Sequence, residues 1–169
     1  MTRQRAEEEL MRSEDLTSIG MQADEVRVRL HPNGIVTYCD CDEDAGGSLE
    51  ITFQPGGGWM SQLAEIRDHE ADGVSLKAGP GLMAVDYLRL VAICRLHVDT
   101  PHIEVDWRSV GLKVSQLALR FGADDLGAVA QMRNEPNTTV TEEGIRRVIR
   151  DAGFVPKKRL ARYGALAVL

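Results

Sequence analysis

Hydrophobic residues recur at helical spacing near the N-terminus of the chain. The positions, three or four residues apart, are Leu16, Ile19, Ala23, Val26 and Leu30. This spacing predicts an amphipathic helix with one buried face. Ser13, followed by two acidic residues, predicts its start, because a hydroxyl caps the first turn and acids favour the positive end of the helix dipole. The turn sequence Pro-Asn-Gly at 32–34 predicts its end.

Two short apolar segments farther along the chain predict β-strands. Residues 35–38 and 49–53 are rich in β-branched and aromatic side chains. Pro55 and the three glycines at 56–58 end the second strand, and we interpret the glycines as a flexible connection. Residues 60–80 carry many charges and predict only a short helix and a loop.

The second half of the chain alternates helices and strands. Residues 84–98 are almost all apolar, which predicts a helix buried on most sides. Residues 103–107 alternate between apolar and acidic side chains and predict a strand with two different faces. A helix ending near Gly122 and another capped by Thr141 follow. This alternation is typical of parallel βαβ units and therefore of an α/β fold.

Composition narrows the functional classes. The 169 residues fit one domain, and the net charge of −6 makes nucleic acid an unexpected partner. No apolar run reaches the ~20 residues that a membrane helix needs. The N-terminus has no apolar stretch behind its basic residues, so we expect no secretory signal. Three cysteines, an odd number, predict a reducing cytoplasm rather than a set of disulfides.

Two long segments carry a family resemblance. VDYLRLVAICRLHVDTPHIEVDWRSVGLKVSQLALRFGADDLG and TEEGIRRVIRDAGFVP resemble the C-terminal third of a radical S-adenosylmethionine (SAM) family. That family contains the cyclic dehypoxanthine futalosine synthases and aminofutalosine synthases of menaquinone biosynthesis, with the deazaflavin (FO) synthases as relatives. ADEVRVRLHPNGIVTY and EITFQPG resemble its first helix and turn and a later barrel strand. The resemblance implies a partial (β/α) barrel with three or four mostly parallel strands and helices outside.

The cysteines depart from the family pattern. The resemblance implies a [4Fe–4S] cluster and SAM, held at a Cys-x-x-x-Cys-x-x-Cys loop after the first strand. Here Cys39 and Cys41 are one residue apart, and the next cysteine is Cys94. A strand–helix unit needs about 30 residues, so residues 39–48 cannot hold one. We therefore expect no catalytic residue, no cofactor in this chain, and no radical SAM activity by this chain alone.

The same comparison divides the chain into four parts within a single domain, 1–169. Residues 13–38 are the N-terminal helix and strand, and residues 39–48 are interpreted as a deletion-junction loop. Residues 49–156 are the C-terminal part of the barrel. Residues 157–169 form a tail, basic and then apolar.

Few residues point to a site. Cys39 and Cys41 are weak candidates for metal ligands, with His31 as a conceivable third, but zinc sites usually need four ligands and a hydrated acidic loop is the favoured interpretation. Cys94 lies in an apolar run and predicts a core residue. His97 and His102 flank a turn; a general base is an alternative, and partly exposed turn residues are favoured. The resemblance implies remnants of a substrate pocket at five positions, which are Gln54, Gly56, Asp106, Asp124 and Asp125.

Glu104 and Asp106 stand where the resemblance implies uncharged residues. In a closed barrel they would face the lumen at a cost, whereas in an open barrel that face meets water. We therefore expect an opened barrel with solvated acids. A new cation site built from Glu104, Asp106 and Asp124 is the alternative.

Three functions remain open from the sequence. The favoured one is a truncated relative of cyclic dehypoxanthine futalosine synthase that is inactive alone. The second is a half-barrel binding or interaction protein, because an open parallel sheet has edges that invite pairing with another copy or with a full-length homologue. The third is an enzyme with unrelated chemistry that uses the acids.

Overall fold

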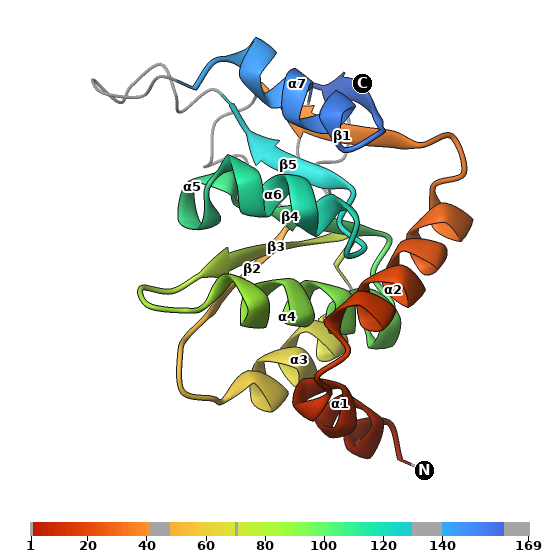
Figure 1. Cartoon of the computed structure of the whole chain (residues 1–169), viewed down its shortest axis with the longest axis vertical. Helices are drawn as coiled ribbons and strands as arrows, with labels where there is room; N and C mark the ends of the chain where they lie inside the picture. Colours follow the sequence, from red (N-terminus) through yellow and green to blue (C-terminus); the bar gives the residue numbers. More distant parts are fainter. Residues whose placement is uncertain (1, 41–47, 70, 130–139, 161–169) are drawn as a thin grey trace.

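The computed structural model describes residues 2–40, 48–69, 71–129 and 140–160. Within these ranges the chain forms one six-stranded sheet with helices packed against it (Figure 1). The helices are α1 (Arg3–Arg12), α2 (Leu16–Leu30), α3 (Trp59–Asp68), α4 (Ala84–His97), α5 (Trp107–Val110), α6 (Leu112–Leu119) and α7 (Glu142–Asp151). The strands are β1 (Ile35–Cys39), β2 (Leu49–Phe53), β3 (Gly73–Ala78), β4 (His102–Val105), β5 (Asp125–Ala128) and β6 (Val155–Arg159).

The sheet is entirely parallel, in the order β2-β3-β4-β5-β1-β6. From β2 to β5 the strands follow chain order, and the first strand then pairs with β5 through Thr37 and Asp125. A closing pair between the first strand and a late one is the arrangement of a (β/α) barrel. The α/β fold with a partial barrel is therefore confirmed, with six strands rather than three or four.

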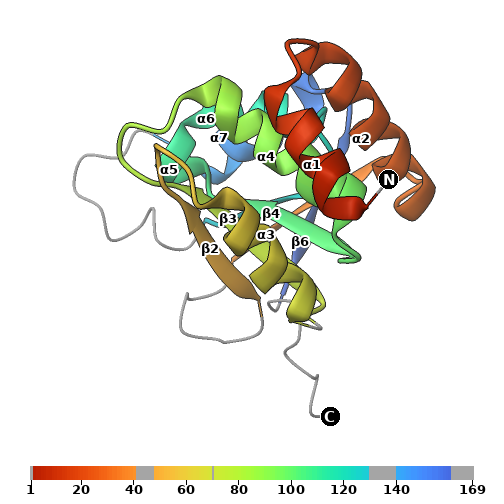
Figure 2. The same cartoon turned by 90° about the horizontal axis from the view of Figure 1, so that it is seen from below.

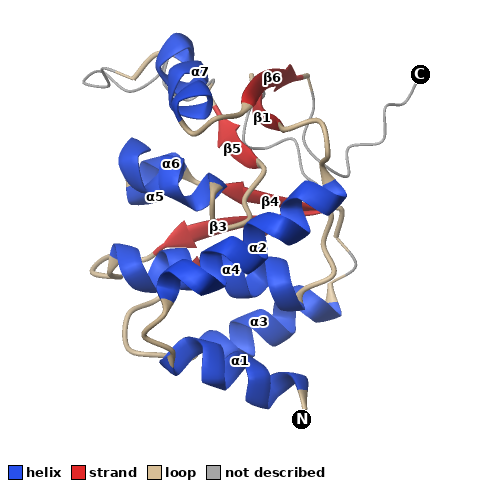
Figure 3. Cartoon of the chain, turned by 45° about the vertical axis from the view of Figure 1, so that its right-hand side comes forward, coloured by secondary structure: helices blue, strands red, loops and turns tan. Residues whose placement is uncertain are grey.

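One face of the sheet carries the hydrophobic core. Ile51, Leu76, Val105 and Leu126 on this face are buried and pack with apolar residues of α3, α4, α6 and α7. Figures 2 and 3 show α4, α6 and α7 on the same side of the strands. Each such side chain contributes about 1.5–3 kcal/mol by leaving water. The predicted burial of α4 on most sides is confirmed by its buried residues, which are Tyr87, Leu88, Leu90, Val91, Ala92, Ile93, Cys94 and Arg95.

The opposite face, here called the inner face, is polar. Residues that pair in register across parallel strands share a face, and this rule places a polar set on one side. The set includes Thr37, Ser75, Glu104, Asp125 and Arg159. Alternation of apolar and polar positions along each strand thus separates a core from a polar surface.

Several elements differ from the sequence-based expectation. The structure has a strand, β3, where a loop was expected, and β6 crosses the expected boundary between the barrel part and the tail. Helix α2 is capped by Asp15, whose carboxylate accepts the Ser18 amide, and not by Ser13. Strand β4 ends at Val105, because Asp106 caps α5 and turns the chain.

Other expected elements are confirmed. The predicted short helix after the glycines is α3, and Gly56, Gly57 and Gly58 all have positive φ, which favours glycine. Thr141 caps α7 by accepting the Gly144 amide. Among the described residues, no helix is long and apolar enough to cross a membrane.

Candidate functional site

Arg159 is the centre of a buried ion-pair network on the inner face. Its guanidinium donates from Nε to Oδ2 of Asp125 at 2.6 Å and from Nη2 to Oδ1 of Asp125 at 3.0 Å. Nη2 also lies 3.0 Å from Oε2 of Glu104. Arg159 is in β6 and Glu104 is in β4, with β1 and β5 between them. The contact therefore spans two intervening strands of the inner face.

The acids of this network are fully engaged. Asp125 is 0% exposed, accepts the Thr37 hydroxyl, and accepts the Gly127 amide at 2.5 Å. Glu104 is 5% exposed and accepts the Ser75 hydroxyl at 2.8 Å. The expectation that the acids of β4 face water is therefore wrong. Burial is tolerated because a guanidinium and hydroxyls replace the lost hydration.

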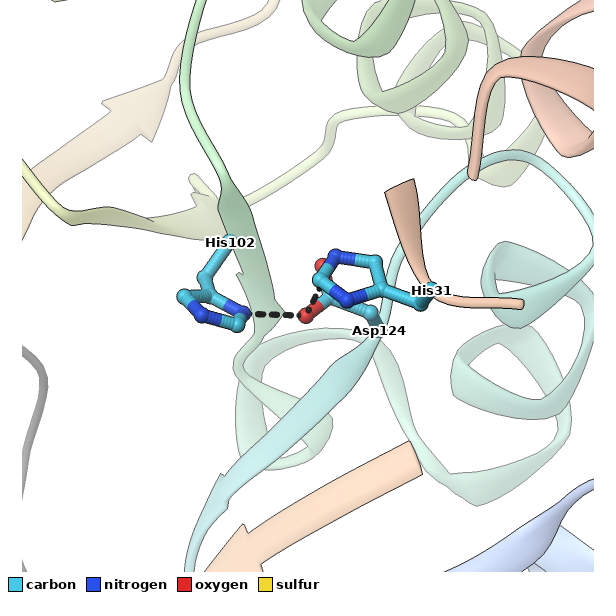
Figure 4. A group of neighbouring side chains, drawn as sticks. All are labelled: His31, His102 and Asp124. Carbon is cyan, nitrogen blue, oxygen red and sulfur yellow. Dashed lines mark hydrogen bonds and ion pairs between the residues drawn. The ribbon is translucent and has the colours of Figure 1, made fainter. Parts of the chain in front are cut away.

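A second cluster joins three segments that are far apart in the sequence. His31 follows α2, His102 begins β4, and Asp124 precedes β5 (Figure 4). His102 Nδ1 lies 2.6 Å from Asp124 Oδ2, and His31 Nε2 lies 3.5 Å from the same oxygen. The two imidazole rings stack with centroids 5.1 Å apart. The first hydrogen bond fixes the His102 tautomer with a proton on Nδ1 when the ring is neutral.

Hydrogen bonds to its second carboxylate oxygen hold Asp124 in place. Its other oxygen, Oδ1, accepts Arg95 Nη2 at 2.6 Å and the Ile103 amide at 2.8 Å. Burial lowers the pKa of Arg95 below its ordinary value, and the charge of Asp124 opposes that change. Arg95 also donates to the carbonyl oxygens of Gly122 and Thr100. These contacts leave Oδ2 directed at the two imidazoles.

A cavity of about 380 Å³ connects the two clusters. Its lining includes His31, His102 and Asp124 at one end and Thr37 and Arg159 at the other. It therefore follows the inner face from the N-terminal ends of β4 and β5 toward the middle of β1 and the C-terminal end of β6. Two lysines, Arg159 and two histidines contribute basic groups to the lining. The acidic residue of the lining is Asp124, whose charge is offset by Arg95.

The five predicted pocket remnants do not form one site. Gln54, Gly56 and Asp106 follow the C-terminal ends of β2 and β4, whereas Asp124 and Asp125 lie at the start of β5. Because the strands are parallel, these groups are at opposite ends of the sheet. Gln54 instead packs on Gly79, where an added Cβ would lie 2.4 Å from its Oε1.

The alternative cation site of three acids also fails to assemble. Glu104, Asp106 and Asp124 each pair with a different arginine, which are Arg159, Arg108 and Arg95. Among the described residues, the group that converges in the manner of metal ligands is His31, His102 and Asp124. The sequence predicted other partners for His31 and His102, because the approach of these two side chains depends on strand order.

Comparison with known proteins identifies the family. The CofH/MqnC C-terminal region matches residues 75–168, more than half of the chain. The chain belongs to this family. Residues 75–168 contain β4, β5, α4 and α6, so the match covers half of the residues that line the cavity described above.

Similar curated proteins agree with this assignment. Cyclic dehypoxanthine futalosine synthase of Streptomyces coelicolor is 33% identical over 106 residues, 59% of this chain and 27% of that protein. Aminodeoxyfutalosine synthase of the same organism is 39% identical over 89 residues, 47% of this chain and 23% of that protein. A 5-amino-6-(D-ribitylamino)uracil--L-tyrosine 4-hydroxyphenyl transferase of Methanosarcina barkeri is 37% identical over 140 residues, 76% of this chain and 35% of that protein.

The chain thus spans only about a quarter to a third of the length of these three relatives. The expected group, radical SAM enzymes of the futalosine and FO synthase type, is confirmed as the source of the resemblance.

The cysteines that the structure describes in this CofH/MqnC-type chain do not fit a [4Fe–4S] cluster. A cluster of this kind takes its protein ligands as thiolates. Cys94 is buried in α4, where burial raises the pKa of its thiol to about 12 and disfavours the thiolate. Its prediction as a core residue is confirmed. Cys39 is fully buried at the end of β1 and is disulfide-bonded, and Cys41 lies outside the described residues.

Proposed function

We propose that this chain is a truncated relative of cyclic dehypoxanthine futalosine synthase that carries out no radical SAM reaction by itself. The observation that carries the proposal is the connection after β1, which ends at Cys39 while β2 begins at Leu49. By resemblance, the cluster loop and several barrel strands belong there, and the available residues hold only two cysteines in the wrong spacing. Its location in the cytoplasm stays a prediction.

The inner face supports the same proposal. Buried carboxylates of Asp125 and Glu104 bond to Arg159, Thr37 and Ser75 within the chain. Side chains that satisfy one another stabilise the half-barrel and are not directed at a substrate. The polar network therefore supports a folded binding scaffold more than a catalytic centre.

A SAM cleavage assay tests the proposal. The purified chain is reconstituted anaerobically with iron and sulfide, reduced with dithionite and incubated with SAM. A full-length cyclic dehypoxanthine futalosine synthase, treated in parallel, serves as the positive control. We expect 5′-deoxyadenosine from the control and none from this chain above the reagent blank. Formation of 5′-deoxyadenosine in proportion to the concentration of this chain would overturn the proposal.

The second candidate is an interaction protein that pairs with a second copy of itself or with a full-length homologue. Strands β2 and β6 are the two edges of the sheet. Pro156 and Lys157 lie in β6, and such residues discourage pairing at an edge. Strand β2 contains neither proline nor lysine, and the side chain of Glu50 is 53% exposed. This asymmetry in composition favours β2 as the pairing edge. A partner strand there would replace the hydrogen bond that the Thr52 carbonyl accepts from Gln62 of α3 at 2.6 Å.

Light scattering on the eluted protein tests the second candidate. If two copies pair through their β2 edges, the variant Thr52→Pro is expected to dissociate the dimer into monomers. The backbone carbonyl of Phe53 points toward β3, because it accepts the Gly79 amide. Backbone groups of successive strand residues point to opposite sides, so those of Thr52 point away from β3, toward the outer edge. Proline at an edge position that points outward is compatible with the strand. A wild-type monomer, alone and mixed with a full-length homologue, would contradict this candidate.

A further inference from the structure

His31, His102 and Asp124 bring three metal-binding atoms together. One ligand atom from each residue lies within 4.8 Å of the other two. Ligand bonds to zinc of about 2.0–2.2 Å place tetrahedral ligand atoms about 3.3 Å apart. The distance of 3.5 Å from His31 Nε2 to Asp124 Oδ2 is close to that value, and the 2.6 Å from His102 Nδ1 to the same oxygen is shorter. Metal binding replaces this hydrogen bond, so the proton of neutral His102 moves from Nδ1 to Nε2, and a small rotation of the partly exposed ring makes room for an ion.

Asp124 is oriented as a monodentate ligand. Arg95 and the Ile103 amide occupy Oδ1, so only Oδ2 faces the imidazoles. Carboxylates that bind metals are commonly fixed by hydrogen bonds of this kind behind the ligand atom. The 2% exposure of Asp124 means that its position is set by the fold.

The donor set selects a class of metal. Two imidazoles and one carboxylate suit zinc, cobalt and nickel, whereas magnesium and calcium prefer oxygen ligands. Arg95 offsets the charge of the carboxylate, which weakens the attraction for hard cations that bind mainly by charge. The imidazole nitrogens are neutral donors and keep their affinity in such surroundings.

The cavity gives the cluster access to solvent. The side chains of His31 and His102 are 19% and 29% exposed and line the cavity of about 380 Å³. Three protein ligands beside an open space match a site that leaves one coordination position for water or a small anion. His31 Nε2 also lies 2.8 Å from the Pro101 carbonyl oxygen, a hydrogen bond that metal binding would exchange for the ligand bond.

We propose that His31, His102 and Asp124 bind one divalent ion of the zinc class at the N-terminal ends of β4 and β5. This site lies at the end of the sheet opposite to the one at which (β/α) barrels place their catalytic groups. It does not depend on whether the chain has radical SAM activity or a protein partner. The ion fastens the end of α2 to two central strands.

Calorimetric titration with Zn²⁺ in a buffer that does not bind metal is the first test. The wild-type chain should take up one ion per chain. Loss of an outer partner of a metal ligand weakens binding by about 10–100-fold, so His31→Gln and His102→Gln should weaken it at least that much. His69→Gln, at an exposed histidine outside the cluster, should bind as the wild type does. Absence of saturable binding, or equal binding by all variants, overturns the proposal.

A second measurement needs no variant. Proton–nitrogen correlation spectra of the four histidine rings, recorded before and after one equivalent of Zn²⁺, should show large shifts for two rings only. These are His31 and His102, while His69 and His97 stay in place. Shifts of His69 or His97 alone would assign the ion elsewhere and overturn the proposal.

Cobalt substitution separates this site from the cysteines. Co²⁺ bound by nitrogen and oxygen ligands lacks the thiolate-to-cobalt charge-transfer band in the near ultraviolet. We expect visible ligand-field bands without that charge-transfer band. A thiolate band that disappears in Cys41→Ser would place the metal at the cysteines and contradict the assignment.

Discussion

Arg159 in β6 forms a two-pronged salt bridge with Asp125 in β5, with hydrogen bonds of 2.6 and 3.0 Å. Strand β1 lies between these two strands. Because Asp125 has no exposed surface, its charge depends on this guanidinium and on local donors. The salt bridge therefore fastens the last strand to the centre of the sheet.

Replacing Arg159 by methionine is expected to destabilise the protein strongly. The change keeps the apolar stem but removes the cation that faces two buried carboxylates, Asp125 and Glu104. Breaking a buried ion pair on one side costs about 3–5 kcal/mol. Urea unfolding followed by circular dichroism measures the loss. Lys157→Met, at an exposed position of the same strand, is the matched control and should change the free energy of unfolding little. An unfolding midpoint of Arg159→Met equal to that of the control would contradict the role of the salt bridge.

Phe154, the residue before β6, lies between two arginines, Arg27 of α2 and Arg120 at the end of α6. The guanidinium carbons of Arg27 and Arg120 lie 4.2 and 4.4 Å from its ring centroid. A double-mutant cycle with Phe154→Leu and Arg120→Gln should give a coupling of about 0.5–1 kcal/mol, the range for partly exposed cation–π pairs. The same cycle with Arg147→Gln, on an exposed helical position, is the control. Additive effects of the first pair would show that the contact contributes nothing.

Physical causes explain which helices and strands could be predicted from the sequence and which could not. α4 was predictable because its apolar residues cover nearly the whole circumference. β3 was missed because Ser75 and Lys77 face the polar inner side, leaving only Val74 and Leu76 as an apolar signal between charged segments. β6 was missed because proline and lysines dominate it, and its pairing with β1 depends on contacts far along the chain.

The cluster of His31, His102 and Asp124 could not be predicted from the sequence, also because it depends on contacts between distant segments. Positions 31, 102 and 124 meet only because β4 and β5 are neighbours and α2 ends beside them. Neither spacing nor composition encodes that neighbourhood. The prediction for Cys94, by contrast, needed only its apolar surroundings on one helix, and it is confirmed.

Stability should depend on Glu142 in acid. The Tyr38 hydroxyl and the Lys158 ammonium donate to its carboxylate, so its pKa in the folded protein lies below the ordinary 4.5. A carboxyl with a lowered folded pKa stabilises the protein above its ordinary pKa, and that contribution is lost as the pH falls through the lowered value. The urea midpoint should therefore fall below about pH 4.5, and Glu142→Gln should flatten part of the fall.

The matched control for this prediction is Glu143→Gln, the neighbouring acid in the same helical turn. If both variants follow the wild-type pH profile, the contact between Tyr38 and Glu142 has no role in acid stability. If only Glu142→Gln flattens the profile, the contacts of Glu142 with Tyr38 and Lys158 are responsible.

Cys94 should resist alkylation in the folded protein. Its side chain is fully buried, and burial raises the pKa of the thiol to about 12, so almost no thiolate exists near pH 8. Treatment with iodoacetamide followed by peptide mass spectrometry should leave Cys94 unmodified in buffer and modified in denaturant. Rapid labelling of Cys94 without denaturant would show that α4 opens far more readily than its packing implies.

Electron paramagnetic resonance after anaerobic iron–sulfide reconstitution tests the central claim most directly, namely that this CofH/MqnC-type half-barrel holds no radical SAM cluster. Reduction with dithionite should give no [4Fe–4S]⁺ signal from this chain, while a full-length family enzyme treated identically gives one. A reduced-cluster signal from this chain that changes on addition of SAM would contradict the account.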